Sequence, residues 1–246
     1  MNEIYRYFIE LAYNGSSYNG WQIQPNAPSV QEDLNKALST LIRKEINVVG
    51  AGRTDTGVHA SFYVARFEVP EEITDMEQLL YKLNRITGKG IAVKKIYRVA
   101  PDMHARFSAK SRTYKYFINK EKDPFTADYA YRVFPLPDIN RMNEACRMLL
   151  EYNDFTSFSK LHTDVKSNIC KVMLATWEDS GSQLVFTIKA DRFLRNMVRA
   201  IVGTTLEVGQ GKISPEDFRT IIERKDRCSA GTSVPGNALF LYDIEY

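Results

Sequence analysis

A glycine-rich turn between two runs of strand-forming residues, within residues 48 to 67, constrains the fold of this chain most strongly. Glycine lets the backbone adopt positive φ and approach a ligand closely. Asp55 lies at the centre of the turn, two residues after Arg53, so the flanking strands hold a reachable acid in place. We interpret Asp55 as a catalytic residue. The alternative, a purely structural Asx turn in Thr54–Gly57, agrees equally well with the spacing alone.

Length and charge bound the class of protein. A chain of 246 residues suffices for one large domain or two modest ones. The net charge is only +3, so any RNA-binding surface must gather its positive charge locally. The sequence shows no signal peptide and no membrane-spanning stretch, so we expect a cytoplasmic protein.

The cysteines and histidines give no sign of a metal site. The chain contains three cysteines, Cys146, Cys170 and Cys228. Their odd number and wide spacing argue against a disulfide framework, and we expect buried thiols in a reducing compartment. The three histidines are His59, His104 and His162. Because they lack metal-ligand spacing, we predict no metal site.

Hydrophobic periodicity predicts a similar order of strands and helices in each half of the chain. The expected strands are residues 4–13, 62–69, 91–99, 113–118, 171–177, 184–190 and 239–244. The expected helices cover residues 30–44, a segment around 76–83, a segment starting near 138, residues 193–208, and a segment starting at Ser214. The turn 179–182 would close a hairpin.

This order predicts an α+β fold with two lobes of the RRM or ferredoxin-like type. The N-terminal lobe, residues 1–101, would carry the catalytic loop, and the C-terminal lobe, residues 102–246, would complete the cleft. We expect the mostly antiparallel sheets to join into one extended sheet. The helices would cover one side of it, and the active-site cleft would lie on the other.

A basic stripe marks the helix expected at residues 193–208. Arg192, Arg195 and Arg199 recur at helical spacing and share a face, while the rest of the segment is nearly apolar. Such a helix should be largely buried, and a buried arginine needs an anion as partner, either a protein carboxylate or a phosphate. The alternative is a solvated basic face.

Aromatic and basic residues alternate along another expected strand, in Arg112, Tyr114, Lys115 and Tyr116. This pattern is typical of a half-buried sheet. The alternative is a platform on which a nucleic-acid base stacks.

With these features in view, the chain resembles the tRNA pseudouridine synthases of the TruA family nearly end to end. The matching segments, in order, are Gly20–Pro25 (G-W-Q-I-Q-P), Val30-Gln31, Gly52–Ala60 (G-R-T-D-T-G-V-H-A), Leu83-Asn84, His104–Phe107 (H-A-R-F), Arg112–Tyr116 (R-T-Y-K-Y), Phe193–Thr204, Asp226-Arg227 and Leu239. So many spaced matches in one order make the resemblance specific.

The resemblance implies isomerisation of uridine to pseudouridine in the anticodon stem-loop of tRNA, at positions 38, 39 and 40, with no cofactor and no metal. It implies that Asp55 is the catalytic aspartate and that Arg199 is its cationic partner. Tyr114 would stack on the target base, and Leu239 would line the pocket. Arg53 would fill the space that the flipped base leaves. The resemblance also implies a homodimer in which one tRNA contacts both subunits.

The chain departs from the family pattern at three places that do not include the expected catalytic residues. Thr56 replaces an alanine, Ile86-Thr87 replaces Leu-Pro, and Ser233–Gly236 replaces an alanine-rich segment.

Two other functions agree with parts of the sequence. An RNA-binding module with RRM-type lobes would account for the aromatic strand, but a carboxylate at the centre of its RNA surface would repel phosphate. An aspartate-dependent hydrolase is less favoured, because no second carboxylate, histidine or metal cluster converges on Asp55 in the sequence.

Overall fold

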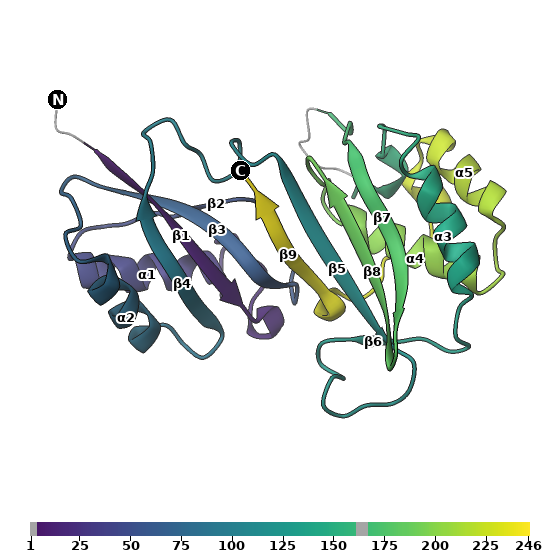
Figure 1. Ribbon diagram of the computed structural model, residues 1–246, viewed down its shortest axis with the longest axis horizontal. Coiled ribbons are helices and arrows are strands. Elements are labelled where there is room, and N and C mark those ends of the chain that lie inside the picture. The colour runs from purple at the N-terminus through teal and green to yellow at the C-terminus, as the bar shows by residue number, and fades with distance from the viewer. Residues whose placement is uncertain (1–3, 161–166) are drawn as a thin grey trace. The chain divides into compact units, whose positions relative to one another are not determined.

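The computed structural model describes residues 4–160 and 167–246, and these form two compact units (Figure 1). Unit 1 contains residues 4–110 together with Leu241–Tyr246. Unit 2 contains Ser111–Phe240. Each unit combines helices with mostly antiparallel strand pairs, as the sequence predicts at this level.

Unit 1 is built on a sheet with the strand order β4-β1-β3-β9, and β2 pairs with β3. Its elements are β1 (Tyr5–Tyr13), α1 (Val30–Ile42), β2 (Val49–Gly50), β3 (His59–Val69), α2 (Met76–Ile86), β4 (Ile91–Arg98) and the part of β9 (Leu239–Glu245) from Leu241 onward. β1 runs antiparallel to both β3 and β4. The register places Ile9 opposite Ala65 on β3 and Ile96 on β4, and all three side chains are buried.

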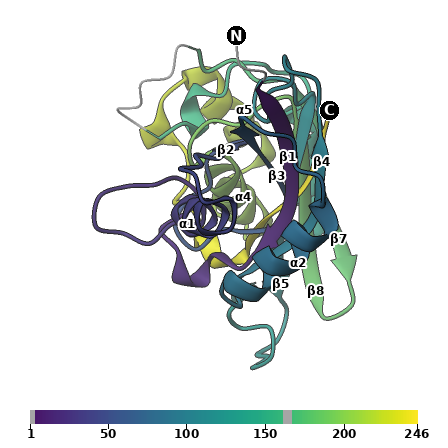
Figure 2. The ribbon, with the colours of Figure 1, turned by 90° about the vertical axis from the view of Figure 1, so that its left-hand side faces the viewer.

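Amphipathic helices provide the rest of the core of unit 1, and α1 and α2 contact each other (Figure 2). The Oγ of Ser29 accepts a hydrogen bond from the Glu32 amide at 3.3 Å, so the first turn of α1 is capped as its sequence predicts. Leu34 and Leu38 on α1 are fully buried, as is Leu83 on α2. These side chains recur at helical spacing, which turns one apolar face of each helix inward.

Unit 2 has the strand order β5-β8-β7, with antiparallel pairs and with β6 added parallel to β5. Its elements are β5 (Ser111–Asn119), β6 (Tyr131–Arg132), α3 (Ile139–Met148), β7 (Val172–Ser180), β8 (Gln183–Ala190), α4 (Met197–Gly209), α5 (Pro215–Arg224) and the start of β9. The three helices contact one another, and α3 packs on β7 (Figure 1). Ser214 and Asp217 form the capping box that starts α5.

The predicted helix at residues 193–208 begins four residues late, at Met197. Asn196 adopts a left-handed conformation with φ of 66°, which an α-helix interior does not allow. The Met197 amide donates to the Leu194 carbonyl at 3.1 Å, so a turn precedes the helix. Arg192 and Arg195 therefore lie outside α4, and the prediction that they share a helix face with Arg199 is wrong.

Two further findings bear on the sequence predictions. Cys146 and Cys170 are buried, but Cys228 is exposed, so the expectation of three buried thiols is wrong for that residue. Cys228 lies in the short 3-10 helix Arg227–Ser229, which has no buried residue, whereas Cys146 lies on the buried face of α3. No helix in residues 4–160 and 167–246 is both long and apolar enough to span a membrane.

α4 is the central helix of unit 2, and most of its residues are buried. Gly203 lies in the middle of this helix, where a Cβ atom would be 1.9 Å from the backbone carbonyl oxygen of Thr232. Glycine therefore allows residues around Thr232 to pass directly against the helix.

We predict that Gly203→Ala destabilises the protein, although alanine ordinarily stabilises a helix relative to glycine. Because the obstacle is backbone, the added methyl group must displace the neighbouring chain. We expect the free energy of unfolding to fall by roughly 1–3 kcal/mol in urea denaturation. In Gly88→Ala, the control, an added Cβ meets nothing within 4 Å, so this variant should unfold as the wild type does. A Gly203→Ala variant as stable as the control would contradict the proposed close approach.

Candidate active site

Asp55 lies in the connection between β2 and β3, in a tight turn. The Asp55 carbonyl accepts a hydrogen bond from the Val58 amide at 3.1 Å. Gly57, at the third position of this turn, has φ of +76°, a conformation that glycine adopts without strain. Asp55 as a residue is partly exposed in this turn.

A second loop, residues 14–24, holds this turn in position. Gly20 has φ of +94°, and a Cβ atom there would lie 2.2 Å from the Thr54 carbonyl oxygen. The Thr54 hydroxyl oxygen accepts a hydrogen bond from the Trp21 amide at 3.1 Å and lies 2.9 Å from the Tyr13 hydroxyl. The Gly57 amide donates to the Tyr18 carbonyl at 3.3 Å. Residues on both sides of Asp55 are therefore bonded to the second loop.

Packed aromatic rings support both loops from the core of unit 1. Trp21 stacks on Tyr63 of β3, with ring centroids 4.2 Å apart, and Tyr13 of β1 meets Tyr63 edge-on at 5.5 Å. The Tyr63 hydroxyl also donates to the Gly52 carbonyl. All three rings are almost fully buried. The aspartate turn is thus supported by buried, packed rings.

His59 contributes to this arrangement from the interior. Its side chain is only 1% exposed, and its Nδ1 accepts a hydrogen bond from the Gly15 amide at 3.0 Å. This contact ties the first residue of β3 to the second loop. Across residues 4–160 and 167–246, no three His, Cys, Asp or Glu side chains group as a possible metal site. His162 lies outside the described residues.

The other residues singled out by sequence belong to unit 2. Tyr114, in the middle of β5, is half-buried and meets Phe193 edge-on at 5.1 Å with an interplanar angle of 88°. Tyr116, two residues on, is fully buried, and its hydroxyl donates to the Pro235 carbonyl at 3.1 Å. Burial raises the pKa of Tyr116 far above its usual value, so it stays neutral. The two tyrosines of this strand therefore differ, because only Tyr114 keeps partial access to solvent.

Arg199 lies in the first turn of α4 and fixes the segment that leads into β9. Its Nε donates to the Val234 carbonyl at 2.7 Å, and the Val234 amide donates to the Arg199 carbonyl at 3.2 Å. Leu239, the first residue of β9, is 4% exposed. The departure from the family pattern at Ser233–Gly236 falls in this segment. The Arg199–Val234 and Tyr116–Pro235 hydrogen bonds are to backbone carbonyls, so these two bonds do not depend on which side chains occur there.

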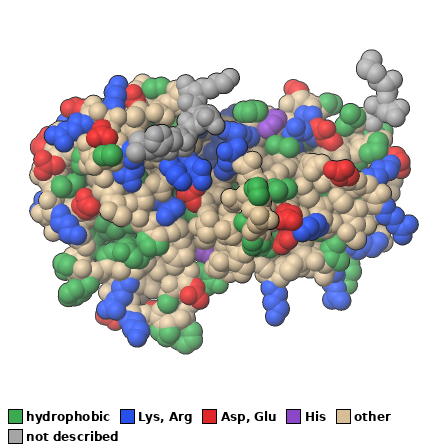
Figure 3. Space-filling view, turned by 180° about the vertical axis from the view of Figure 1, so that it is seen from behind, with side chains coloured by type: hydrophobic (Ala, Val, Ile, Leu, Met, Phe, Trp, Pro, Cys, Tyr) green, Lys and Arg blue, Asp and Glu red, His purple; other side chains and the backbone are tan. Residues whose placement is uncertain are grey.

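Basic residues occur in both units, and Figure 3 shows Lys and Arg side chains on the surface of each. Arg53 is exposed beside Asp55 in sequence. In unit 2, Arg112 donates to the Asp191 carbonyl at 2.8 Å, and Arg192 donates to the Ser167 carbonyl at 3.2 Å. Both acceptors are neutral backbone carbonyls, so the expectation of an anionic partner for a buried arginine stays a prediction. Arg195 is exposed.

Comparison with known proteins gives one consistent result. A family model described as tRNA pseudouridine synthase matches residues 11–108 and 145–246. A tRNA pseudouridine synthase A of Bacteroides fragilis is 59% identical over 244 residues, which are 99% of this chain and 97% of that protein. The proteins of the same name from Porphyromonas gingivalis and Bacillus subtilis are 51% and 39% identical, covering 98% and 96% of this chain and 97% of each relative.

Matches of this extent show that the protein is an RNA-modifying isomerase. The chain belongs to the tRNA pseudouridine synthase A family, as its sequence motifs indicate. Tyr114 falls in the stretch that the family model leaves unmatched, although the relatives align across nearly the whole chain.

We predict that Gly20→Ala impairs both stability and activity. An L-residue at φ of +94° is strained, and its Cβ would press on the Thr54 carbonyl next to Asp55. We expect at least about 1 kcal/mol of lost unfolding free energy, together with a lower kcat for pseudouridine formation. The control, Gly52→Ala, adds a methyl group in the same connection with nothing within 4 Å. Equal kcat for the two variants would show that the Gly20 contact does not position the aspartate.

Proposed function

We propose that this protein converts uridine to pseudouridine in the anticodon stem-loop of tRNA, at positions 38, 39 and 40, with Asp55 as the one catalytic aspartate and with no cofactor. The observation that carries the proposal is the rigid turn that presents Asp55, in a chain of this family. Uracil must be detached from its ribose, rotated and rejoined through carbon 5. An ionised carboxylate can assist as a nucleophile or as a base.

The two units would contribute different parts of this chemistry. Unit 1 contains Asp55 and Arg53, and unit 2 contains Tyr114, Arg199 and Leu239. We propose that the Arg199 guanidinium is the cation that keeps the Asp55 carboxylate ionised when the substrate excludes water. Its Nε contact with Val234 supports this role, because a guanidinium anchored at one edge has fewer orientations to lose.

The remaining roles concern the target base. Extrusion of a base from a stacked helix costs a few kcal/mol, so residues that hold the base or fill its place favour the flipped state. We propose that the Tyr114 ring stacks on the uracil and that Leu239 lines the apolar wall of its pocket. Phe193 supports the Tyr114 ring edge-on. Arg53, exposed next to the turn, would occupy the vacated space in the stem.

We further propose that each lobe, residues 1–101 and 102–246, has an RRM- or ferredoxin-like sheet. The second lobe would complete the active site. Modification of three adjacent positions favours recognition of tRNA by backbone and shape more than by base sequence. We also propose that the enzyme is a homodimer, because a surface built from two chains would concentrate basic residues despite the net charge of +3.

We predict that Asp55→Asn abolishes isomerisation while leaving tRNA binding intact, because the amide keeps the size of the side chain but loses its charge. The rate should fall by at least roughly 10²-fold, the lower range of what a positioned acid–base group contributes. The assay is release of tritium from carbon 5 of labelled uridine in tRNA, with the RNA chain checked for cleavage.

The same assay separates the three functions. Tritium release with an intact RNA chain identifies a synthase, strand cleavage identifies a hydrolase, and binding without either identifies a binding module. Turnover by Asp55→Asn at the wild-type rate would refute the role of this residue.

We predict that activity falls in the order wild type, Arg199→Lys, Arg199→Met. Lysine keeps the positive charge but loses the fork that bonds Val234, whereas methionine loses both. We expect a loss of roughly 10²-fold in kcat for Arg199→Met, as for other removed electrostatic groups. Urea unfolding of each variant corrects for structural damage. Equal kcat for lysine and methionine variants would show that the charge of Arg199 does not assist the reaction.

A further inference from the structure

A short segment of unit 2, residues 230–235, runs alongside α4 in the opposite direction. The Gly231 amide donates a hydrogen bond to the Thr204 hydroxyl at 3.1 Å. Further along, the Val234 amide donates to the Arg199 carbonyl at 3.2 Å. As the segment advances toward β9, its contacts therefore move back along the helix to the first turn, which contains Arg199. This is the arginine to which the proposed function gives the cationic role.

The hydroxyl group of Ser233 joins this segment to two other parts of unit 2. Its oxygen accepts a hydrogen bond from Asn196 Nδ2 at 2.6 Å and another from Arg227 Nη2 at 2.9 Å. A hydroxyl oxygen has two acceptor sites, so these two donors occupy both. Asn196 directly precedes α4, and Arg227 lies in the 3-10 helix that follows α5. One small side chain thus connects three pieces of the fold.

Asn196 immediately precedes α4, but its side chain is directed to Ser233. An asparagine at this position usually accepts a hydrogen bond from an amide of the first turn. Within the described part of the chain, the Asn196 side chain makes no such capping bond, and its Nδ2 bonds Ser233. The Asn196 carbonyl accepts from the Ala200 amide at 3.0 Å, which begins the helix. The first turn of α4, which contains Arg199, is therefore coupled to Ser233.

Arg227 holds the same segment through three oxygen atoms. Its Nη1 donates to the carbonyls of Ala230 and Gly231, each at 3.2 Å, and its Nη2 donates to Ser233. A guanidinium presents its donors in a fixed plane, so these bonds orient the three acceptors together. Arg227 is half-buried. Removal of the Ser233 hydroxyl would therefore leave a charged donor without this acceptor, which is costly.

We propose that Ser233 is a positioning residue for Arg199. The two residues are linked through the main chain, because Val234 directly follows Ser233 and its carbonyl accepts from Arg199 Nε at 2.7 Å. They are also linked through Asn196, at the start of the turn that carries Arg199. Ser233 thus fixes both the carbonyl that the guanidinium bonds and the helix turn from which it extends. The inference rests on the proposed function, in which this guanidinium assists the catalytic aspartate.

The first experiment compares pseudouridine formation by Ser233→Ala, Ser233→Thr and the matched control Ser182→Ala. Ser182 is exposed in the turn between β7 and β8, so its variant makes the same chemical change away from the segment. We expect kcat to fall roughly tenfold in Ser233→Ala, because a small displacement of a reacting group is costly. KM should not change, since the group acts in the transition state. Ser233→Thr keeps the hydroxyl and, like the control, should keep the wild-type kcat.

A double-mutant cycle tests whether Ser233 acts through Arg199. In the Arg199→Met background, Ser233→Ala should lower kcat by less than about twofold, because the group that Ser233 orients is already absent. A further loss as large as that in the wild-type background would show that Ser233 affects the reaction by another route, and this would overturn the inference. Urea unfolding of every variant separates loss of folded enzyme from loss of orientation.

The second experiment observes the Arg199 side chain without turnover. Because Arg199 Nε is bonded to the Val234 carbonyl, we expect its proton to exchange slowly with solvent in the wild type. Its NMR signal is assigned by its loss in Arg199→Lys. Exchange should be at least roughly tenfold faster in Ser233→Ala and unchanged in Ser182→Ala. An exchange rate that Ser233→Ala does not alter would overturn the inference, whatever the activity of the variant.

The two measurements together separate this inference from the proposed function. If the wild type formed no pseudouridine but Ser233→Ala still sped exchange of the Arg199 proton, the positioning contact would stand while the proposed activity failed. If the wild type were active and Ser233→Ala sped exchange without lowering kcat, the activity would stand and the positioning role of Ser233 would be overturned.

Discussion

The close approach of Gly20 to the Thr54 carbonyl is the contact on which the aspartate turn depends. Any side chain at position 20 would collide with that carbonyl oxygen, and the positive φ of Gly20 lets the loop fold back over it. Once the loops touch, the Thr54 hydroxyl accepts from the Trp21 amide, and the Trp21 ring reaches Tyr63. Because Gly20 has no side chain, the Trp21 backbone reaches the Thr54 hydroxyl, and the Trp21 and Tyr63 rings pack together beneath the turn that contains Asp55. This arrangement explains how a partly exposed carboxylate is fixed without being buried.

Unit 2 also holds a loop in place through backbone contacts, in this case the segment just before β9. Arg199 donates to the Val234 carbonyl, and Tyr116 donates to the carbonyl of the next residue, Pro235, just before β9 begins. These donors come from a helix and a strand that are far apart in sequence. Because the acceptors are main-chain oxygens, the segment can change its side chains without losing its position. Fixing a loop from two sides in this way is an effective route to preorganisation, since neither element must move when substrate binds.

The sequence predicts the helices and strands well where periodicity and caps agree. Ser29 and Ser214 start their helices as expected, because a capping oxygen and an apolar stripe point to the same boundary. The start of α4 was missed because Phe193 and Leu194 fit the helical pattern while lying outside the helix. Phe193 packs against Tyr114 instead, and the left-handed Asn196 sets the boundary. The start of α4 therefore depends on the tertiary contact of Phe193 with Tyr114, which a local sequence pattern does not predict.

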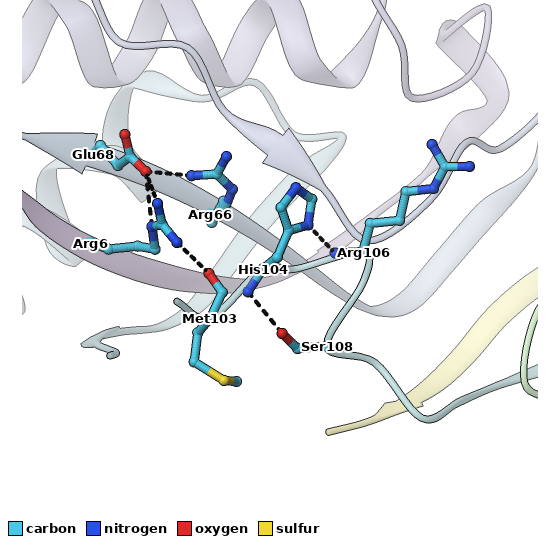
Figure 4. Close-up of polar contacts among 7 residues, drawn as sticks. All are labelled: Arg6, Arg66, Glu68, Met103, His104, Arg106 and Ser108. Carbon is cyan, nitrogen blue, oxygen red and sulfur yellow. Dashed lines mark hydrogen bonds and ion pairs between the residues drawn. The ribbon is translucent and has the colours of Figure 1, made fainter. Parts of the chain in front are cut away.

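At the candidate site, too, the sequence predicts the local features but not the contacts between distant residues. Glycines and strand formers mark the turn that contains Asp55, so the sequence predicts this turn, and its catalytic role stays a prediction. The contacts of Thr54 and His59 involve residues about 30 to 45 positions away, which no local pattern reveals. The cluster formed by Arg6, Arg66, Glu68 and His104 (Figure 4) is also not predicted by any local pattern. Its members come from β1, β3 and the loop after β4, and the His104–Phe107 motif gave no hint of a partner on β3.

Within that cluster, charges of opposite sign fix one another's positions. Glu68 neutralises part of the charge of Arg6 and Arg66, which lowers the long-range field, but its hydrogen bonds also hold both guanidinium groups in fixed directions. A flexible lysine on the surface would contribute more field and less direction. For a ligand recognised by the shape of its backbone, the direction of each donor matters more than the total charge. Pairing one carboxylate with two arginines therefore fixes the directions of both guanidinium groups and joins β1 to β3 at the same time.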